Sequence, residues 1–342
     1  MKVLAGDLGG TKTLLLIAEY DGTRLHRLRE ARYRSDAYEG LLPMVQAFLS
    51  AAGADAAGVG HACFGIAGPV EAAAEDAQRA RVTNLPWDLD SRRLAADLGL
   101  AGVRLINDFQ AVGYGIDALE QDAFATLQEG RPVPGGPRAL IGAGTGLGEG
   151  LLVWQRDHYE VLASEGGHAD FAPIDAEQTV LLEALRRRYG HVSWERVLSG
   201  HGLVNVFEHL PRAPGERPTP ELEAALQEGD PAAQISAFAL AGRDPLADRA
   251  LTCFVRIYGA QAGNLALTFL ATGGVFVAGG IAPKILPRLR AGPFLEAFRD
   301  KGRLSDLLAA IPVRVILDPE VGLLGAALAA ARAATAGVDA KR

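Results

Sequence analysis

Short apolar runs separated by polar turns open the chain. Residues 3–5 and 13–18 are apolar and β-prone, the Gly9-Gly10 pair divides them, and residues 25–33 alternate loosely between apolar and polar positions. Alternation with a period of two is typical of strands, and a glycine pair between two such runs is typical of a tight turn. The pattern therefore predicts a β-meander at the start of the chain.

A helix and two buried strands are predicted further along. Residues 40–52 have the spacing of an amphipathic helix, whereas residues 61–67 and 103–106 are short, mainly apolar runs, which favour buried strands. The second of these strands ends at Asn107-Asp108, directly before another apolar segment. Polar side chains at the end of a buried strand indicate a candidate site at that edge of the sheet.

A glycine-rich pattern occurs twice. Residues 5–12, AGDLGGTK, and residues 141–148, IGAGTGLG, are each followed by apolar residues, so each predicts a strand, a glycine turn and a second strand. Glycines can take positive φ and present successive backbone N–H groups to phosphate oxygens, and the threonine hydroxyl adds a donor. Asp7 beside such phosphates could hold hydrated Mg²⁺. An ordinary hairpin turn is the alternative for either copy alone, and two copies favour two lobes.

Composition narrows the class of protein. About half of the 342 residues are apolar, which is enough for two lobes with a cleft. The net charge is −7 and the pI about 5.6, whereas nucleic-acid binding usually shows a basic surface, so no nucleic-acid partner is expected. Cys63 and Cys253 are too few for a disulfide framework or a zinc site, and no signal peptide or membrane span is recognisable. We therefore expect a cytoplasmic protein without a membrane partner.

A series of motifs resembles those of one family. They are GDLGGTKT at Gly6, GIAGPV at Gly65, TNLPW at Thr83, INDFQAVGYGI at Ile106, GAGTGLG at Gly142, SEGGHADFAP at Ser164, GHVSWERVLSG at Gly190, GNLAL at Gly263, GGVFVAGGIAP at Gly273 and GLLGAA at Gly322. Together they resemble the bacterial glucokinase family, a branch of the sugar-kinase, actin and heat-shock-chaperone ATPase superfamily. The resemblance implies a two-lobed α/β fold of the actin-like ATPase (ribonuclease H-like) type, with the active-site cleft between the lobes. It also implies a small domain of residues 1–117 completed by a C-terminal helix 322–342, a large domain of residues 118–321, and a homodimer.

Phosphoryl transfer to an alcohol suggests a role for the Asn-Asp pair. The reaction needs a carboxylate that accepts the hydroxyl proton, with metal and backbone N–H groups that neutralise developing charge. Asp108 is the candidate general base, because its carboxylate would emerge at the end of a buried strand, and Asn107 could bond sugar hydroxyls. A cap on the following helix is the alternative. The resemblance implies sugar binding by both residues and catalysis by Asp108.

Further sugar ligands are implied downstream. Glu165 and His168 lie three residues apart around a flexible glycine pair, and such side chains suit pyranose hydroxyls, which both donate and accept. By resemblance both contact the sugar, although a surface or capping histidine is the alternative for His168. Glu195 has the local pattern of an acid in the first turn of a helix capped by Ser193, and only the resemblance makes it a sugar ligand. Asn84 is either a border of the same pocket or a turn asparagine.

A third glycine cluster concerns the nucleotide. Residues 273–281 predict a strand flanked by glycine pairs, and a buried strand with a simple terminal turn is the alternative. In the superfamily such a turn lets adenosine approach bare backbone. The resemblance thus implies ATP and Mg²⁺ as cofactors, with Asp7 holding Mg²⁺ through water. The implied nucleotide-binding residues are Gly6, Asp7, Leu8, Gly9, Gly10, Thr11, Gly144, Thr145, Gly146, Gly279 and Gly280.

The implied function is ATP-dependent phosphorylation of D-glucose to glucose 6-phosphate in glycolysis. The alternatives are a kinase for mannose, fructose or glucosamine and a non-catalytic sugar sensor on the same fold. A chaperone-like or filament-forming ATPase would have no use for this set of sugar-binding residues. Lys12 stands where the closest glucokinases commonly carry asparagine and resembles the related ROK kinases, but the cysteine-rich zinc signature of ROK proteins is absent. Residues 211–248, polar and then helical, have no assigned function.

Overall fold

The structure, a computed structural model, describes residues 1–73, 77–83 and 85–339. It divides into two compact units, one formed by residues Met1–Gln121 together with the chain from Asp318 onward, and the other by Asp122–Leu317. Each unit combines parallel and antiparallel strands with flanking helices. The predicted α/β class is therefore confirmed.

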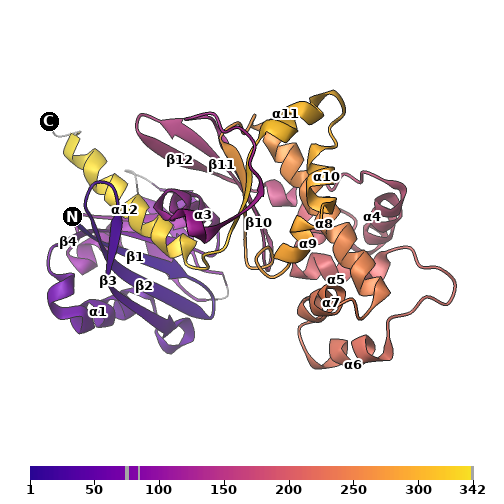
Figure 1. The fold of residues 1–342 in the computed structure, drawn as a ribbon. Coiled ribbons are helices and arrows are strands. Elements are labelled where there is room, and N and C mark those ends of the chain that lie inside the picture. The colour runs from indigo at the N-terminus through magenta and orange to yellow at the C-terminus, as the bar shows by residue number, and fades with distance from the viewer. Residues whose placement is uncertain (74–76, 84, 340–342) are drawn as a thin grey trace. The chain divides into compact units, whose positions relative to one another are not determined.

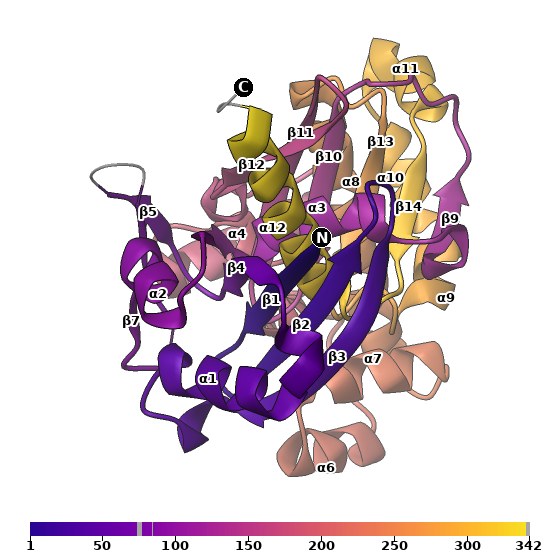
Figure 2. The same ribbon diagram turned by 90° about the vertical axis from the view of Figure 1, so that its left-hand side faces the viewer.

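The first unit contains one larger and one smaller sheet (Figures 1 and 2). Its strands are β1 Lys2–Leu8, β2 Lys12–Tyr20, β3 Leu25–Arg34, β4 Val59–Ile66, β5 Val70–Ala72, β6 Gln78–Arg81, β7 Asp88–Asp90 and β8 Gly102–Asn107. The larger sheet has the order β3-β2-β1-β4-β8, in which β1 is antiparallel to β2 and parallel to β4, and β8 is parallel to β4. The predicted β-meander and both predicted buried strands are confirmed. The smaller sheet is the antiparallel set β5-β6-β7.

Helices cover the larger sheet of the first unit. They are α1 Leu41–Ala52, α2 Ser91–Leu98, α3 Asp108–Gly115 and α12 Val321–Asp339. Leu4 and Ile17 of the sheet share an apolar core with Phe48 of α1, so α1, which was predicted from its spacing, is held by its apolar face. Helix α12 packs against α3 and against β1 and β4. The last helix of the chain therefore belongs to the unit that contains its first strand.

Glycines allow α3 and α12 to approach closely. A Cβ added to Gly325 would overlap the backbone oxygen of Ala111, and one added to Gly115 would overlap the backbone oxygen of Val321. Neither glycine has the positive φ that would itself demand glycine. The GLLGAA motif is thus explained by packing between two helices.

The second unit is built on a six-stranded sheet. Its strands are β9 Phe124–Gln128, β10 Arg138–Ala143, β11 Leu147–Gln155, β12 His158–Ser164, β13 Gly274–Ala278 and β14 Val313–Ile316. The order is β12-β11-β10-β13-β14-β9, with β10 antiparallel to β11 and parallel to β13. A meander followed by a parallel neighbour also describes β3-β2-β1-β4. The predicted repeat of strand, glycine turn and strand is therefore confirmed in both units.

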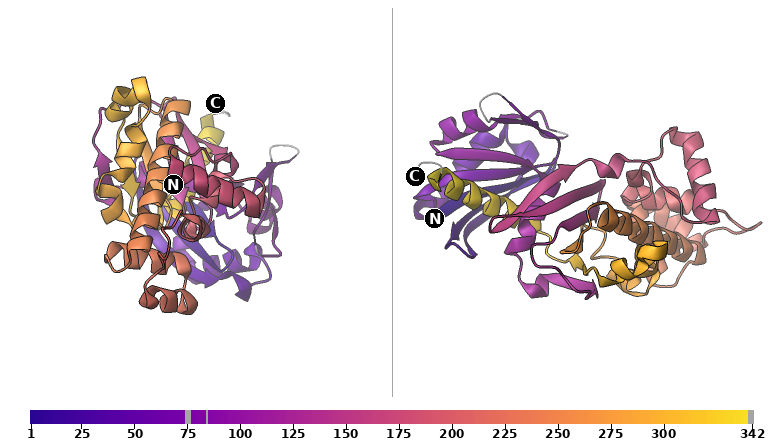
Figure 3. Two further views of the ribbon diagram at one scale, coloured as in Figure 1. Left: turned by 90° about the vertical axis from the view of Figure 1, so that its right-hand side faces the viewer. Right: turned by 90° about the horizontal axis from the view of Figure 1, so that it is seen from above.

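Helices form the rest of the second unit (Figures 1 and 3). They are α4 Ala176–Tyr189, α5 Gly200–His209, α6 Pro220–Glu228, α7 Pro231–Leu240, α8 Pro245–Thr268, α9 Leu286–Arg290, α10 Pro293–Arg299 and α11 Ser305–Ala310. Buried α8 lies beside α10, where a Cβ on Gly259 or Gly263 would overlap or crowd the backbone oxygens of Phe294 and Phe298. The GNLAL motif thus also has a packing explanation. Among the described residues, no helix is both long and apolar enough to span a membrane.

Candidate active site

One edge of the first unit's sheet gathers the predicted acidic residues. Asp7 of β1 is in register with Gly65 of β4, and Gly65 is in register with Ile106 of β8. Asn107 then ends β8, and Asp108 begins α3. Because these three strands are parallel, their carboxyl ends meet at the same edge. A Cβ on Gly65 would lie 3.2 Å from the Cβ of Ala111, so the glycine leaves room for α3.

Asn107 occupies the N-cap of α3. Its Oδ1 accepts hydrogen bonds from the backbone N–H groups of Phe109 at 2.9 Å and Gln110 at 3.3 Å, and its Nδ2 donates to the carbonyl oxygen of Gly68 at 3.2 Å. The helix-cap alternative considered for this pair is therefore realised by Asn107. The Nδ2 amide nitrogen carries two hydrogens, so the bond to Gly68 leaves a second hydrogen that could be donated to a ligand. Asp108 Oδ1 also accepts from the N–H of Phe109 at 2.8 Å.

Asp7 is destabilised as a charged group. Burial, followed by the negative charge of Asp108, raises the pKa of Asp7 from 3.8 to about 6, while Lys12 acts in the opposite direction. Two carboxyl groups that repel each other at a strand edge favour a proton or a cation between them. This edge of the sheet therefore attracts positive charge.

Ser35, which follows β3 in the chain, makes two hydrogen bonds to the first glycine turn. The Ser35 hydroxyl donates to the carbonyl oxygen of Gly9 at 2.8 Å, and its backbone N–H donates to that of Thr11 at 3.0 Å. Within the turn, the N–H of Gly9 donates to the carbonyl oxygen of Lys12 at 3.0 Å. No sequence pattern marks Ser35, because a lone serine after a strand is not distinctive. Its role is to fix the shape of the turn.

Some residues predicted to bind the nucleotide are buried in the core and do not expose a side chain or backbone to a ligand. Leu8 is fully buried in the apolar core, and a Cβ on Gly6 would crowd Phe64. The expected use of positive φ is wrong for Gly9, Gly144 and Gly146, which lie outside the left-handed region. At Gly146, what the turn requires is the absence of a side chain.

In the second glycine turn, a carboxylate from another segment replaces the missing side chain. A Cβ on Gly146 would overlap Oε2 of Glu195, and that same oxygen accepts a hydrogen bond from the backbone N–H of Leu147 at 3.0 Å. Ser193 is the N-cap residue and Glu195 lies in the first turn, as expected, but the helix is a short 3₁₀ helix, Trp194–Arg196, and the Ser193 side chain makes no cap hydrogen bond. Glu195 thus lies against the turn that starts β11.

Glu165 and His168 lie on a short turn that rests on the same strand. Their side chains are largely exposed, and Glu165 Oε2 is 3.8 Å from His168 Nε2. A Cβ on Gly167 would overlap the carbonyl oxygen of Leu147, the residue whose N–H bonds Glu195. The glycine pair therefore serves close packing, and the second unit brings all three predicted sugar ligands to the start of β11.

A pocket of about 780 Å³ in the second unit includes the predicted nucleotide residues Gly144, Thr145 and Gly280. Gly279 and Gly146 do not line it: Gly279, with φ of 82°, faces the backbone of Ala143, and Gly146 faces Glu195. A Cβ on Gly144 or Gly280 would meet nothing within 4 Å. These two glycines therefore leave bare backbone beside the pocket.

Helices α5 and α7 supply pocket residues that sequence reasoning missed. Val204 comes from α5, Pro231 and Ala237 come from α7, and Lys284 lies beyond β13. Helix α7 lies inside residues 211–248, which had no assigned function. Its alanines and Pro231 look like ordinary helix composition, and only their position beside the second glycine turn identifies them. Helix α7 therefore forms part of the wall of this pocket.

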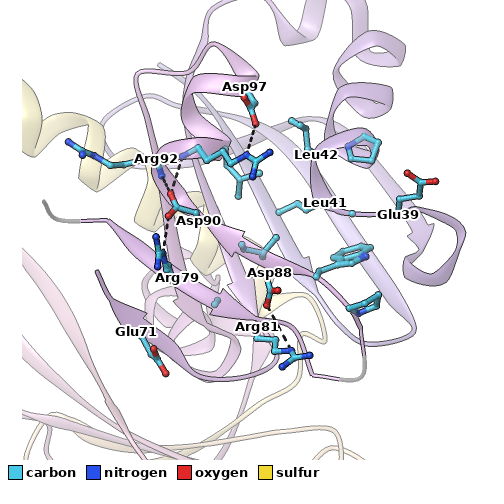
Figure 4. A pocket seen from close by; sticks show the side chains of 18 of the residues that line it. Glu39, Leu41, Leu42, Glu71, Arg79, Arg81, Asp88, Asp90, Arg92 and Asp97 are labelled. Carbon is cyan, nitrogen blue, oxygen red and sulfur yellow. Dashed lines mark hydrogen bonds and ion pairs between the residues drawn. The ribbon is translucent and has the colours of Figure 1, made fainter. Parts of the chain in front are cut away.

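A larger pocket, of about 1070 Å³, lies within the first unit (Figure 4). Its arginines face its own carboxylates: Arg79 and Asp90 are 3.1 Å apart, and Arg93 and Asp97 are 3.6 Å apart. None of the described residues predicted for the active site lines it. Size alone therefore does not identify the nucleotide pocket.

Two points concern metal and the remaining site residue. The described part of the chain contains no group of three or more histidine, cysteine or acidic side chains that could hold a metal ion. Asn84, considered for the sugar pocket, lies outside the described residues.

Comparison with known proteins bears on the family and the fold of the chain. Residues 4–333 match the family model for glucokinase. The chain is 46% identical to a glucokinase of Nostoc sp. (strain PCC 7120) and 44% identical to one of Synechocystis sp. (strain PCC 6803), over 96% of this chain and 99% and 98% of those proteins. The crystal structure of glucokinase from an Antarctic psychrotroph is similar with a TM-score of 0.83 and 28% identity, over 97% of this chain and 99% of that one. The predicted actin-like ATPase fold is thereby confirmed, and the chain belongs to the glucokinase family.

Proposed function

We propose that this protein transfers the γ-phosphoryl group of ATP to the 6-hydroxyl of D-glucose and so forms glucose 6-phosphate for glycolysis. The observation that carries the proposal is the pair of carboxyl groups, Asp7 and Asp108, at the end of parallel strands in a chain of the glucokinase family. Phosphoryl transfer consists mainly of positioning and of neutralising charge. Such an edge supplies a proton acceptor and a place for the cation.

Asp108 acts as the general base. Its position at the first residue of α3 orients the carboxylate, which accepts a hydrogen bond from the backbone N–H of Phe109. The carboxylate accepts the proton of the 6-hydroxyl as that oxygen attacks the γ-phosphorus. Asn107, Glu165, His168 and Glu195 bind the remaining hydroxyls of the sugar.

The nucleotide is bound by the two glycine turns and the turn after β13. Adenosine fits the 780 Å³ pocket of the second unit, which combines apolar walls with the bare backbone of Gly144 and Gly280. Gly146 and Gly279 shape this region by close packing. The phosphates are bound by the backbone and hydroxyl groups of the turn in residues 6–11.

Mg²⁺ fits the chemistry of the donor set at the first turn. Asp7 provides carboxylate oxygens, which Mg²⁺ prefers, and burial together with the charge of Asp108 raises the pKa of Asp7, an effect that a bound cation would offset. Asp7 would hold the ion through water, and the phosphates would complete its shell. When bound, the ion neutralises charge on the transferred phosphoryl group.

The wider functional assignment rests on the family. We propose a cytoplasmic homodimer whose partners are glucose and ATP, with no nucleic-acid or membrane partner, and with functional domains 1–117 plus 322–342 and 118–321. A kinase for mannose, fructose or glucosamine, or a non-catalytic sugar sensor, remains the alternative that experiment decides.

The test is sugar-dependent release of ADP from Mg·ATP with glucose, mannose, fructose and glucosamine. The unaltered chain should turn over fastest with glucose, and Asp108→Ala should lower kcat by about 10²- to 10⁴-fold while sugar affinity falls much less. Exposed Asp122 provides the control, because Asp122→Ala removes a similar side chain outside the site. Absence of turnover with every hexose, despite ATP binding, would favour the sensor. Equal loss of sugar binding and turnover in Asp108→Ala would contradict the role of base.

A further inference from the structure

Glu149 is a buried carboxyl group that the proposed reaction does not use. It lies on β11, its residue is only 3% exposed, and it is paired across the sheet with Ser164 of β12. Gln261 of α8 donates a hydrogen bond from Nε2 to Glu149 Oε1 at 2.8 Å, and Asn264 donates in turn to Gln261 Oε1 at 3.1 Å. Burial raises the pKa of Glu149, and the bond from Gln261 lowers it. Burying a carboxyl group is costly, so a specific use for it is expected.

The second oxygen of Glu149 lies against the turn that carries Glu165 and His168. A Cβ on Gly166 would overlap Glu149 Oε2, although Gly166 has no positive φ that would require glycine. The absence of a side chain at Gly166 is therefore demanded by the space that Glu149 fills. Because Glu149 is buried and held by Gln261, its carboxyl group cannot simply turn aside.

The turn is supported at two points of one strand. Gly167 rests on the backbone of Leu147, and Gly166 rests on Glu149, two residues further along β11. The N–H of Gly166 also donates to Ser164 Oγ at 3.0 Å, and the N–H of His168 donates to the carbonyl oxygen of Glu165 at 2.9 Å. Leu147 and Glu149 point to the same face, because alternate residues of a strand do so. This face is the platform for the turn.

We infer that Glu149 is a positioning residue for sugar binding: it packs against Gly166 of the turn 165–168 and connects this turn, through Gln261, to helix α8. The inference rests on the proposed function, in which Glu165 and His168 bind the sugar. Hydrogen bonds to hydroxyls depend steeply on placement, so a turn that shifts loses affinity for the sugar. Glu149, Gly166 and Gln261 are not among the residues that line the nucleotide pocket. The effect should therefore fall on the sugar and spare ATP.

The experiment combines Gly166→Ala with Glu149→Ala in a double-mutant cycle. Gly166→Ala should raise the KM for glucose about tenfold, because the new methyl group displaces the turn, and should leave the KM for ATP within about twofold. Glu149→Ala alone should raise the KM for glucose less, about threefold to tenfold, because the turn loses a packing contact but no steric overlap displaces it. In the double variant the small residue at 149 makes room for the methyl group. Its KM for glucose should therefore lie well below the product of the two single effects.

Two controls separate positioning from general damage. Gly150→Ala places a methyl group next along the same strand, where its closest contact, the carbonyl oxygen of Leu162, is at an ordinary 3.6 Å, and it should leave the KM for glucose unchanged. Glu149→Gln keeps an oxygen that accepts from Gln261 and fills the same volume, so it should retain the KM for glucose within about twofold.

Several results would overturn the inference. They are strictly multiplicative effects of the two substitutions, equal rises of both KM values, or a lowered melting temperature with unchanged KM in every variant. Failure of the unaltered chain to phosphorylate glucose would instead contradict the proposed function. Direct binding of glucose by calorimetry, measured without ATP, would still report on the turn in that case.

Discussion

In the first unit, β1 is followed by a glycine turn and by β2, and β4 lies parallel to β1; in the second unit, β10, β11 and β13 repeat this plan. The two turns differ in the source of their carboxyl group. The first has Asp7 in the strand itself, where the second has Ala143 at the equivalent place of the pattern. The second receives Glu195 from a segment 48 residues away in sequence.

The surroundings of Ala143 explain why no acid stands there. Its N–H donates to the hydroxyl oxygen of buried Tyr258 at 3.0 Å, and Gly279 approaches its backbone so closely that a Cβ would overlap it. A carboxylate at this position would be buried without a partner, which is costly. Under the proposed function, the first copy of the motif would lie beside the cation and phosphates, and the second copy beside the neutral adenosine.

The units also differ in how their packing is completed. The first unit depends on close contact between α3 and α12, which lie far apart in sequence, whereas α8 and α10 make the corresponding glycine contact within a continuous segment. Alanine at Gly325 should destabilise the first unit by about 2–4 kcal/mol, because its Cβ would overlap the backbone of Ala111, which cannot move out of the way. Urea unfolding with hydrogen exchange resolved by unit measures this effect.

Gly322 of the same helix provides the matched control. A Cβ there would have its closest contact at 3.7 Å, with Val112, so Gly322→Ala should change stability by less than about 1 kcal/mol. Equal destabilisation by both substitutions would show that flexibility of the helix, and not close packing, explains the two glycines. Loss of protection confined to the second unit would contradict the assignment of α12 to the first.

Replacement of Asp7 by asparagine tests the role of the carboxyl group that the first turn has in its own strand. The folded-state pKa of about 6 exceeds the ordinary 3.8, so the charged carboxylate opposes folding above pH 6, and this cost disappears as the pH falls toward 4. Asp7→Asn should therefore raise the free energy of unfolding at pH 7.5 by about 1–2 kcal/mol, allowing for partial exposure, and should change it little at pH 4. Urea titrations at both pH values measure the difference.

The same variant should lose most of its turnover with Mg·ATP, since the asparagine amide is a weaker partner for hydrated Mg²⁺. A variant that is more stable yet less active would show that the acid at this turn is kept for function. A gain in stability that is equal at both pH values would mean that the charge of Asp7 is not its cause.

Narrowing the 780 Å³ pocket of the second unit should give the smallest effect. Ala237 is exposed on α7 and lines the pocket, so Ala237→Trp should raise the KM for ATP about fivefold by filling space, without disturbing the core and with little change in the KM for glucose. Ala224→Trp, at an exposed position of α6 outside the pocket, is the control. Steady-state kinetics with each substrate varied in turn distinguishes the two. A rise in the KM for glucose alone would remove α7 from the nucleotide site.

The fold could be predicted where the information is local. Strands, turns and the repeat follow from the period of apolar positions and from glycine pairs, and α1 follows from helical spacing, whereas α12 was expected from the family resemblance. The bond from the N–H of Leu147 to Glu195, the clamp by Ser35 and the support of Gly166 by Glu149 all join segments distant in sequence. No periodic pattern records such contacts. The reason for a glycine, conformation or space, likewise becomes visible only when its neighbours are placed.

The division of the first unit in sequence affects the order in which the protein is completed during synthesis. Its sheet is encoded before Gln121, but α12 follows Leu317. At ~5–20 residues per second, translation of the intervening unit takes about 10–40 s. During that time the surface of α3 that receives α12 has no helix to cover it. We expect the nascent first unit to depend on chaperones in this interval, and the helix that begins at Asp108 to be fixed only when the last helix leaves the ribosome.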